Sequence, residues 1–227
     1  MLNWAARYFP ILKVLRQPGA MCATLLEVGS GSVGIGKFYR APFVGCDLSF
    51  LFPPRAPMRP VIATATGLPF GDESFDAVVV SDVLEHVPPE HRAAVIQEAL
   101  RVMRRVAVFA FPCGSQAFDY DRKLAETYDR EQQIRPVWLQ EHMQFSFPTE
   151  QLFEHLHRQW TVTTFGNENL DVHYWIMRKE MHRLWNYVFA IMLAALPGVV
   201  EYILRRADRE PYYRRIVVVR RRLASTK

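Results

Sequence analysis

The stretch from Thr24 to Gly36, TLLEVGSGSVGIG, constrains the fold of this chain more than any other part of its sequence. A short apolar run, Leu25 to Val28, breaks into three closely spaced glycines before a more helical pattern starts near Lys37. Glycines let the backbone turn sharply off a strand and let a ligand approach, and the amides of a following helix offer hydrogen-bond donors. The stretch therefore predicts a strand, a glycine turn and a helix, the opening unit of a nucleotide-binding α/β sheet.

The glycine spacing fits two classes of cofactor. The pattern Gly29-x-Gly31-x-x-Gly34 satisfies the dinucleotide fingerprint, and Asp47 ends the next apolar run, where a ribose-binding carboxylate belongs. The same stretch also has the form acidic-x-Gly-x-Gly, because Glu27 lies two positions before the first glycine. Taken alone, these residues leave an NAD(P)-dependent oxidoreductase open.

A second block, from Gly67 to Arg105, narrows the choice. Its sequence, GLPFGDESFDAVVVSDVLEHVPPEHRAAVIQEALRVMRR, together with the acidic-x-Gly-x-Gly motif, resembles class I S-adenosylmethionine-dependent methyltransferases of the type 11, or ubiquinone-biosynthesis-like, family. The later segment WLQEH is similar to methyltransferases encoded alongside polysaccharide and glycosyltransferase genes. The resemblance implies an α/β fold with a Rossmann-like, seven-stranded, mostly parallel sheet, helices on both faces and an antiparallel last strand. It also implies S-adenosylmethionine as the cofactor.

The resemblance assigns parts of the cofactor to parts of the chain. Glu27 and the glycine turn would hold the methionine end, Asp47 the ribose, and residues 64–68 the adenine. Many relatives have an aspartate where this chain has Thr64, and a glycine where it has Val33. The candidate cofactor-binding residues are Glu27, Gly29, Ser30, Gly31, Gly34, Asp47, Leu48, Thr64, Thr66, Gly67, Leu68, Ser81 and Asp82.

Polar side chains follow the fourth predicted strand, FDAVVV, at the edge where open α/β sheets bind ligands. Three interpretations of Asp82, Glu85 and His86 stay open. They can cap the next helix, or His86 can act as a general base toward an acceptor hydroxyl near neutral pH. Alternatively, they resemble the acidic-x-x-Glu-His cluster of certain metal-dependent O-methyltransferases, with His142 as a further ligand. We take His86, Asp82 and His142 as candidate catalytic residues and assign no metal ligand.

The chain is interpreted as one methyltransferase domain over residues 1–227, with a helix over residues 1–20 before the glycine stretch. Residues 114–150 form a substrate-side insertion, in which Trp138, Glu141 and His142 are acceptor-side candidates. The strands WTVTTFG and RRIVVVRRR are expected to pair, so residues 167–212 between them are a helical apolar insertion. No helix is expected after the second strand, because prolines interrupt LSFLFPPRAPMRP.

The insertion contains the apolar run LWNYVFAIMLAALPGVVEYIL between basic flanks. Its uncharged part, Leu184 to Val200, only just reaches the length of about 17–25 residues that spans a bilayer, and Pro197-Gly198 interrupts it. The run is apolar on nearly every side, so something must cover it: the substrate pocket, a second subunit or a bilayer surface. We favour peripheral membrane contact through residues 181–206 and leave an oligomer open.

Composition adds few constraints. The net charge of +5 comes largely from late arginines that suit a solvated edge strand, so no nucleic acid partner is expected. Cys22, Cys46 and Cys113 are scattered and odd in number, and no signal-peptide pattern opens the sequence. We therefore expect a cytoplasmic protein with contact to the inner face of the membrane.

The expected activity is methyl transfer to a small or lipid-linked acceptor: a glycolipid, sugar or quinone-like hydroxyl. Two alternatives remain. One is a degenerate methyltransferase fold that serves as a binding or membrane-scaffold module, suggested by Thr64 and Val33. The other is the NAD(P)-dependent oxidoreductase.

Overall fold

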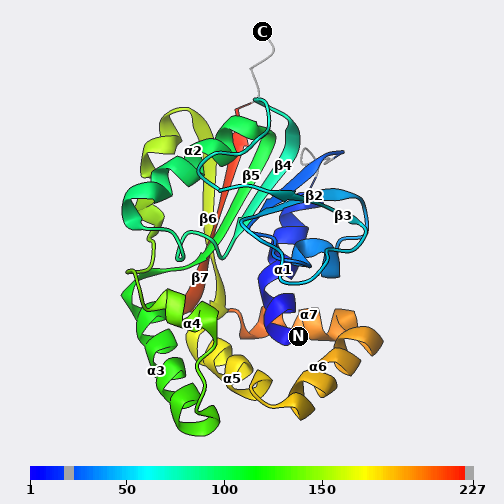
Figure 1. Cartoon of the computed structure of the whole chain (residues 1–227), viewed down its shortest axis with the longest axis vertical. Coiled ribbons are helices and arrows are strands. Elements are labelled where there is room, and N and C mark those ends of the chain that lie inside the picture. The colour runs from blue at the N-terminus through cyan, green and yellow to red at the C-terminus, as the bar shows by residue number, and fades with distance from the viewer. Residues whose placement is uncertain (18–22, 223–227) are drawn as a thin grey trace.

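A seven-stranded sheet forms the centre of the computed structural model, which describes residues 1–17 and 23–222 (Figure 1). Its order is β3-β2-β1-β4-β5-β7-β6. The first five strands run parallel, and β7 runs antiparallel to both of its neighbours. The predicted fold class, including the antiparallel last strand, is confirmed. The strands are β1 (Leu25–Val28), β2 (Phe43–Asp47), β3 (Met58–Ile62), β4 (Phe75–Ser81), β5 (Met103–Pro112), β6 (Trp160–Asn169) and β7 (Tyr212–Arg221).

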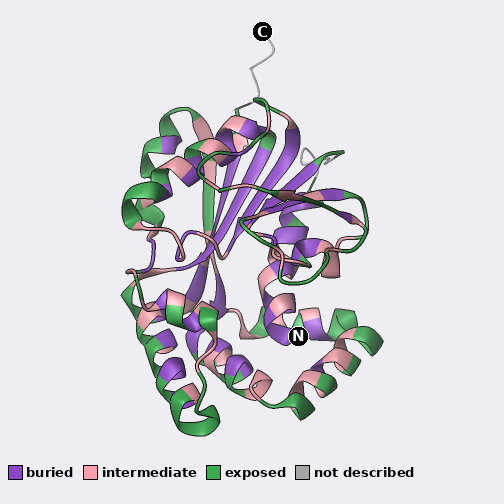
Figure 2. Cartoon of the chain, in the orientation of Figure 1, coloured by how far each residue is buried: buried purple, intermediate pink, exposed green. Residues whose placement is uncertain are grey.

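The central strands are buried on both faces because helices cover each side of the sheet (Figure 2). Every residue of β4 is buried, as expected for a nearly continuous apolar run in a parallel sheet. One face packs against α2 (Arg92–Val102), which follows the short turn η2 (Pro89–His91), and against η3 (Glu150–Arg158). The other face packs against α1 (Leu2–Leu15).

The prediction of a helix after the glycine turn is wrong. Only a single 3-10 turn, η1 (Gly34–Lys37), forms there. The face of the sheet that such a helix would cover is already occupied by α1, whose Ile11 and Leu12 join one core with Leu25 and Val79. Residues 48–57, all described, contain no helix, as predicted from the prolines. The N-terminal helix therefore supplies the cover that the chain omits after β1. Its predicted end, residues 18–20, and Cys22 lie outside the described residues.

The third strand begins earlier than predicted. The segment VIATA was expected to form it, but β3 pairs with β2 from Met58 opposite Phe43 to Ile62 opposite Asp47. Because β3 is an edge strand, it can include Pro60 and so begin before VIATA. Thr64 consequently lies in the loop beyond the strand, at the carboxyl edge of the sheet.

The remaining helices gather beyond the carboxyl ends of the parallel strands (Figure 1). They are α3 (Gly114–Gln132) and α4 (Val137–His142) between β5 and β6, and α5 (Leu170–Glu180), α6 (Arg183–Ala195) and α7 (Pro197–Ala207) between β6 and β7. Although three helices separate them, β6 and β7 pair from Trp160 opposite Arg221 to Asn169 opposite Tyr212. The insertion packs on α1 through a small core that includes Leu2, Ile176 and Phe189.

The helices α6 and α7 form a bent apolar pair, here called the elbow (residues 183–207). In the part of the chain that the structure describes, no single helix is long and apolar enough to cross a membrane. The two helices pass that test together by length and composition, but their axes differ by 112°.

Candidate functional site

The glycine turn holds its shape by bonds to β2 and leaves one side open. Gly29 N and Ser30 N both donate to Cys46 O. Gly31 has a φ of +53°, which favours glycine, and a Cβ added there would meet nothing within 4 Å. At Gly34, which also has positive φ, an added Cβ would collide with Glu27 Oε2. The backbone is therefore accessible at Gly31 and packed at Gly34.

Asp47 lies against this open part of the turn. Its Oδ2 accepts from Gly31 N at 2.7 Å, and its Oδ1 accepts from Leu48 N at 2.7 Å. A carboxylate has about four acceptor sites, so Asp47 can still accept from two hydroxyls. Ser30 is buried, and its hydroxyl donates to Gly31 O, so this side chain braces the turn. The structure thus brings together Asp47 and the glycine turn as the sequence predicted.

Glu27 is placed differently from the prediction of a direct cofactor ligand. It is fully buried; Tyr8 Oη donates to Oε1 at 2.8 Å and Ile35 N donates to Oε2 at 2.7 Å. Burial raises the pKa of Glu27 to about 7, although both hydrogen bonds lower it. In this structure Glu27 therefore ties the glycine turn to α1, and its role as a cofactor ligand stays a prediction.

The residues predicted beside the adenine lie at the end of β3. Thr64, Thr66 and Gly67 are exposed, and the two threonine hydroxyls lie 2.9 Å apart. Leu68 departs from the prediction: its side chain belongs to the core, and its amide donates to Glu98 Oε2. Leu48, next to Asp47, is exposed and offers an apolar cover.

Asp82, predicted both as a catalytic residue and as a cofactor ligand, is held by two arginines. Arg214 donates to its two oxygens at 2.9 and 3.0 Å, and Arg7 Nη2 lies 2.6 Å from Oδ2. Burial alone would raise the pKa of Asp82, but the charges of Arg214 and Arg7 hold it well below its usual range. A carboxylate so paired stays ionised near neutral pH, and in this structure Asp82 braces the edge of the sheet; its assignments as a catalytic residue and as a cofactor ligand stay predictions.

Arg214 joins the ends of two strands. It is 1% exposed and also donates to Glu168 Oε2 at 2.7 Å. Asp82 directly follows β4, and Glu168 lies near the end of β6. Both have a left-handed backbone conformation, with φ of +50° at Asp82 and +65° at Glu168. Such conformations are strained for residues other than glycine, and they persist where the surroundings fix them. The arginine of β7 is therefore what fixes both strand ends.

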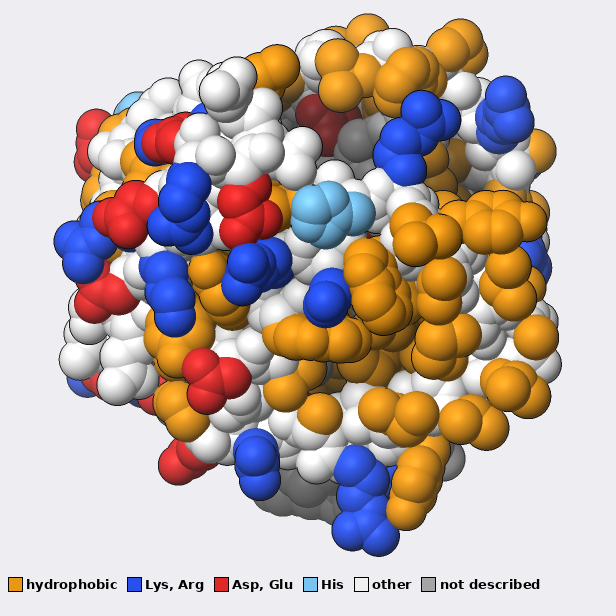
Figure 3. Space-filling model, turned by 90° about the horizontal axis from the view of Figure 1, so that it is seen from below, with side chains coloured by type: hydrophobic (Ala, Val, Ile, Leu, Met, Phe, Trp, Pro, Cys, Tyr) orange, Lys and Arg blue, Asp and Glu red, His pale blue; other side chains and the backbone are white. Residues whose placement is uncertain are grey.

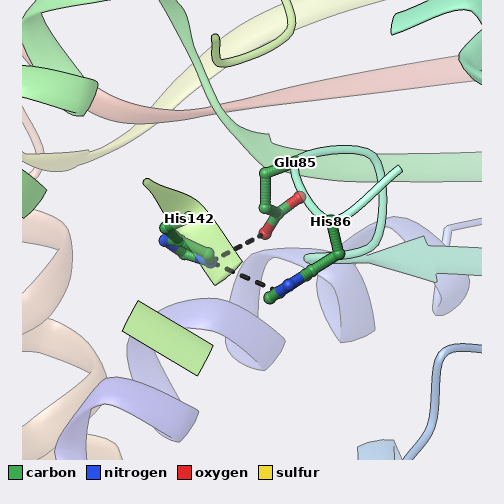
Figure 4. Close-up of side chains that lie close together, drawn as sticks. All are labelled: Glu85, His86 and His142. Atoms are coloured by element: carbon green, nitrogen blue, oxygen red, sulfur yellow. Dashed lines mark hydrogen bonds and ion pairs between the residues drawn. The ribbon is translucent and has the colours of Figure 1, made fainter. Parts of the chain in front are cut away.

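A second group of polar side chains lies beside this network. His142, at the end of α4, points toward Glu85 and His86, which follow β4 (Figure 4). The two Nε2 atoms of the histidines are 3.3 Å apart, and His142 Nε2 is 3.9 Å from Glu85 Oε1. Glu85 is fully buried, and neither of its carboxylate oxygens has a hydrogen-bond partner.

Neighbouring carboxylates orient both imidazoles. Asp121 Oδ2 is 2.6 Å from His142 Nδ1, and Tyr213 Oη donates to the same oxygen at 2.9 Å. Glu141 Oε2 lies 2.9 Å from His86 Nδ1. A carboxylate beside Nδ1 favours the tautomer with its proton on that nitrogen. In neutral rings, both Nε2 lone pairs then face each other, an arrangement that needs a proton or a cation between them.

Electrostatics favour a cation at this point. Burial and then the neighbouring charge of His142 lower the pKa of His86, so its imidazole stays neutral at pH 7. Burial, followed by the charge of Asp82, raises the pKa of Glu85 well above its usual range. Glu85, His86 and His142 each offer one ligand atom, and these atoms lie within 4.8 Å of one another. Two imidazoles and a carboxylate form a set that divalent first-row metals accept.

The sequence did not single out several residues of this edge. One signal was available: in β7, Arg214 shares a strand face with the buried Ile216 and Val218, and a charge on a buried face needs partners. No comparable signal marks the other residues, which come from five separate elements. The residues missed are Arg7, Asp121, Glu168, His173, Tyr213 and Arg214.

Comparisons with known proteins bear on the domain and on its fold. Residues 26–111, from β1 to the end of β5, match a family model described as a methyltransferase domain. No curated protein matches the sequence.

Solved structures share the fold at low sequence identity. A Haemonchus contortus phosphoethanolamine N-methyltransferase 2, in complex with phosphomonomethylethanolamine and S-adenosylhomocysteine, matches at TM-score 0.57 and 13% identity, over 94% of this chain and 52% of that one. The YcgJ protein of Bacillus subtilis matches at TM-score 0.54 and 12% identity, over 98% and 100% of the two chains. A magnesium protoporphyrin IX methyltransferase from Synechocystis, with bound S-adenosylhomocysteine, matches at 0.50 and 13%, over 97% and 82%.

Proposed function

We propose, from the premise that residues 26–111 are a methyltransferase domain, that this enzyme transfers a methyl group from S-adenosylmethionine to a hydroxyl of a small or lipid-linked acceptor. The cofactor is the one whose product, S-adenosylhomocysteine, occupies two of the similar structures. A glycolipid, a sugar or a quinone-like compound fits the acceptor class.

The sheet topology favours this function over the oxidoreductase. Dinucleotide-binding sheets continue with a parallel sixth strand beside the fifth. Here β7 is inserted antiparallel between β5 and β6. Its first residues bring Arg214 to the carboxyl edge, where a parallel strand would end rather than begin.

The open side of the glycine turn is the proposed cofactor site. Gly31 leaves space for close approach, Asp47 keeps acceptor capacity for the ribose hydroxyls, and Ser81, buried at the end of β4, has a hydroxyl with no partner. Displacement at a sulfonium already has a good leaving group, so these residues mainly align the cofactor and exclude water.

The acceptor side is proposed to be the group Glu85, His86 and His142, holding a divalent cation such as Zn²⁺ or Mn²⁺. The observation that carries this proposal is the fully buried Glu85, whose two carboxylate oxygens have no hydrogen-bond partner and whose Oε1 lies 3.9 Å from His142 Nε2. A cation held there would lower the pKa of an acceptor hydroxyl. Asp121 and Glu141 would keep both Nε2 atoms turned toward it.

Calorimetric titration with S-adenosylhomocysteine tests the cofactor site. The parent protein should bind, and Asp47→Ala should bind at least about tenfold more weakly, since hydrogen bonds to a charged group contribute about 1.5–3 kcal/mol. Glu90→Ala removes an exposed carboxylate from η2 and should bind like the parent. Absence of binding to the parent protein would favour the degenerate scaffold instead.

Metal titration tests the acceptor side. Protein stripped with a chelator should take up one Mn²⁺ or Zn²⁺, and Glu85→Gln and His142→Ala should each abolish that uptake. His155→Ala, which removes an exposed histidine of η3, is the matched control. Equal uptake by all four proteins would show that the cation binds elsewhere and return the pair of histidines to general-base catalysis.

A further inference from the structure

The elbow presents hydrophobic side chains to solvent on the same side of the molecule as the candidate site. Both lie beyond the carboxyl ends of the parallel strands (Figure 1). Viewed from that side, hydrophobic side chains gather over the part of the surface formed by α6 and α7 (Figure 3). The large hydrophobic residues exposed there are Leu184, Tyr187, Ile191, Leu196, Val199, Tyr202 and Ile203.

Each helix of the elbow has two apolar faces. The inner faces are used, because Phe189 of α6 and Val200 of α7 are each 2% exposed and pack with Leu2 and Ile176. The outer faces repeat at helical spacing: Leu184 is followed three and seven residues later by Tyr187 and Ile191 in α6. A helix whose inner face already holds it to the body needs no apolar outer face for folding. The exposed apolar outer face is therefore expected to be an interaction surface.

Basic residues border this outer face. Arg183 begins α6, and Arg205 and Arg206 end α7, against a single acidic residue, Glu201, in the two helices. All three arginines are exposed, and Arg206 Nε donates to the hydroxyl of Tyr202. An apolar surface with tyrosines and arginines at its margin has the composition of a helix that lies in a bilayer interface.

The charge decides between a bilayer and a second copy of the chain. In a two-fold dimer through this face, the same arginines would approach one another, because such an interface is self-complementary. Opposite anionic lipid, each arginine is attracted instead. The bend of 112° between α6 and α7 also lays both helices along a surface rather than through a membrane.

We infer that the outer face of the elbow docks on an anionic bilayer and turns the carboxyl edge of the sheet toward it. This inference deepens the proposed function, because a lipid-linked acceptor would then enter the site from the membrane. The docking itself requires no turnover.

Vesicle sedimentation with the full chain tests the docking. Vesicles of phosphatidylcholine with phosphatidylglycerol should sediment the protein, vesicles of phosphatidylcholine alone should sediment at least about tenfold less, and added salt should weaken the binding. The triple variant Leu184→Ser, Ile191→Ser, Ile203→Ser should lose at least about tenfold in partitioning, because each removes exposed apolar area.

A matched variant and two other measurements make the outcome decisive. Leu51→Ser, Phe52→Ser, Ile134→Ser removes hydrophobic residues elsewhere that are at least as exposed, and it should sediment like the parent. Arg205→Gln, Arg206→Gln should remove the preference for anionic lipid. All variants should bind S-adenosylhomocysteine like the parent, so a failure of docking is distinguishable from a failure of the methyltransferase function. Equal sedimentation of the parent and the elbow triple variant, or a parent dimer in light scattering that the triple variant breaks without any vesicle binding, would overturn the inference.

Discussion

The two halves of the sheet edge are built on different principles. On the side of β1 and β2, the glycine turn and Asp47 join through backbone amides within 24 residues of chain, and the turn is open to solvent at Gly31. On the side of β4 and β7, the partners are buried charged side chains, and Arg214 and Asp82 are 132 positions apart in the chain. The first half depends on local conformation, the second on tertiary structure. The predictions below test that difference, from the largest expected effect to the smallest.

Arg214→Met should have the largest effect, because it leaves Asp82 and Glu168 buried without their shared cation. Breaking a buried ion pair on one side costs about 3–5 kcal/mol, and the free energy of unfolding from urea denaturation should fall by that amount. Arg215→Met, the next residue, removes a half-buried arginine whose partner is Glu150 and should lose less than about 1 kcal/mol. Similar losses in both variants would contradict the distinction between the halves.

Glu27→Gln should make stability less dependent on pH. The pKa of Glu27 is about 7 in the folded protein and near 4.5 when unfolded, so its contribution is fully present below pH 4.5 and is lost as pH rises through 7. The variant does not titrate there. Between pH 5 and 8 its unfolding free energy should therefore rise relative to the parent by roughly 2–3 kcal/mol.

The check is urea denaturation of parent and variant at several pH values. Glu90→Gln, in which an exposed carboxylate is neutralised, should follow the parent throughout. A constant difference between Glu27→Gln and the parent across this range would mean that Glu27 ionises normally.

Asp121→Asn should weaken the proposed cation site without unfolding the protein. The amide can present an N–H to His142 Nδ1, which would turn the ring to the other tautomer and leave the proton on Nε2. Loss of such an orienting carboxylate typically lowers metal affinity about 10- to 100-fold. Metal titration measures this, with the exposed Asp119→Asn as the control. Unchanged affinity would remove Asp121 from the positioning of His142.

Gly31→Ala should show the smallest change. There is room for the methyl group, but the positive φ is strained for alanine, so the loss of stability should be about 1 kcal/mol. Gly198→Ala also meets no neighbour and has no positive φ, so it should be neutral or slightly stabilising in thermal unfolding. Equal behaviour of the two variants would show that conformation does not constrain the turn.

The contrast between the halves also explains what the sequence could predict. The glycine turn with Asp47 and the missing helix after β2 follow from short stretches with strong local preferences, and the mostly parallel sheet with an antiparallel last strand was implied by the resemblance to class I methyltransferases. The helix after the glycine turn was predicted wrongly because α1 takes its place in the core. No pattern in the sequence shows that α1 covers that face of the sheet. Local spacing cannot report such a substitution of one helix by another.

The acceptor side was predicted only in part for the same physical reason. The sequence analysis named Glu85, His86 and His142 as candidates for acid–base or metal chemistry, and the structure brings them together. Asp82 stands in the same short segment, but it is paired with Arg7 and Arg214, which approach from α1 and β7 and which the sequence did not single out. A side chain's protonation depends on charges that a sequence pattern does not place.

The ion pair between Asp82 and Arg214 affects when this edge of the sheet can fold during synthesis of the chain. A ribosome synthesises β4 before it reaches β7, so a growing chain carries Asp82 without Arg214 while 132 further positions are added, and Glu168 while 46 are added. Until Arg214 emerges, burial of these two carboxylates is unfavourable, and the edge of the sheet that holds Glu85 and His86 stays unfinished. This edge of the sheet can therefore be completed only after the seventh strand has been synthesised.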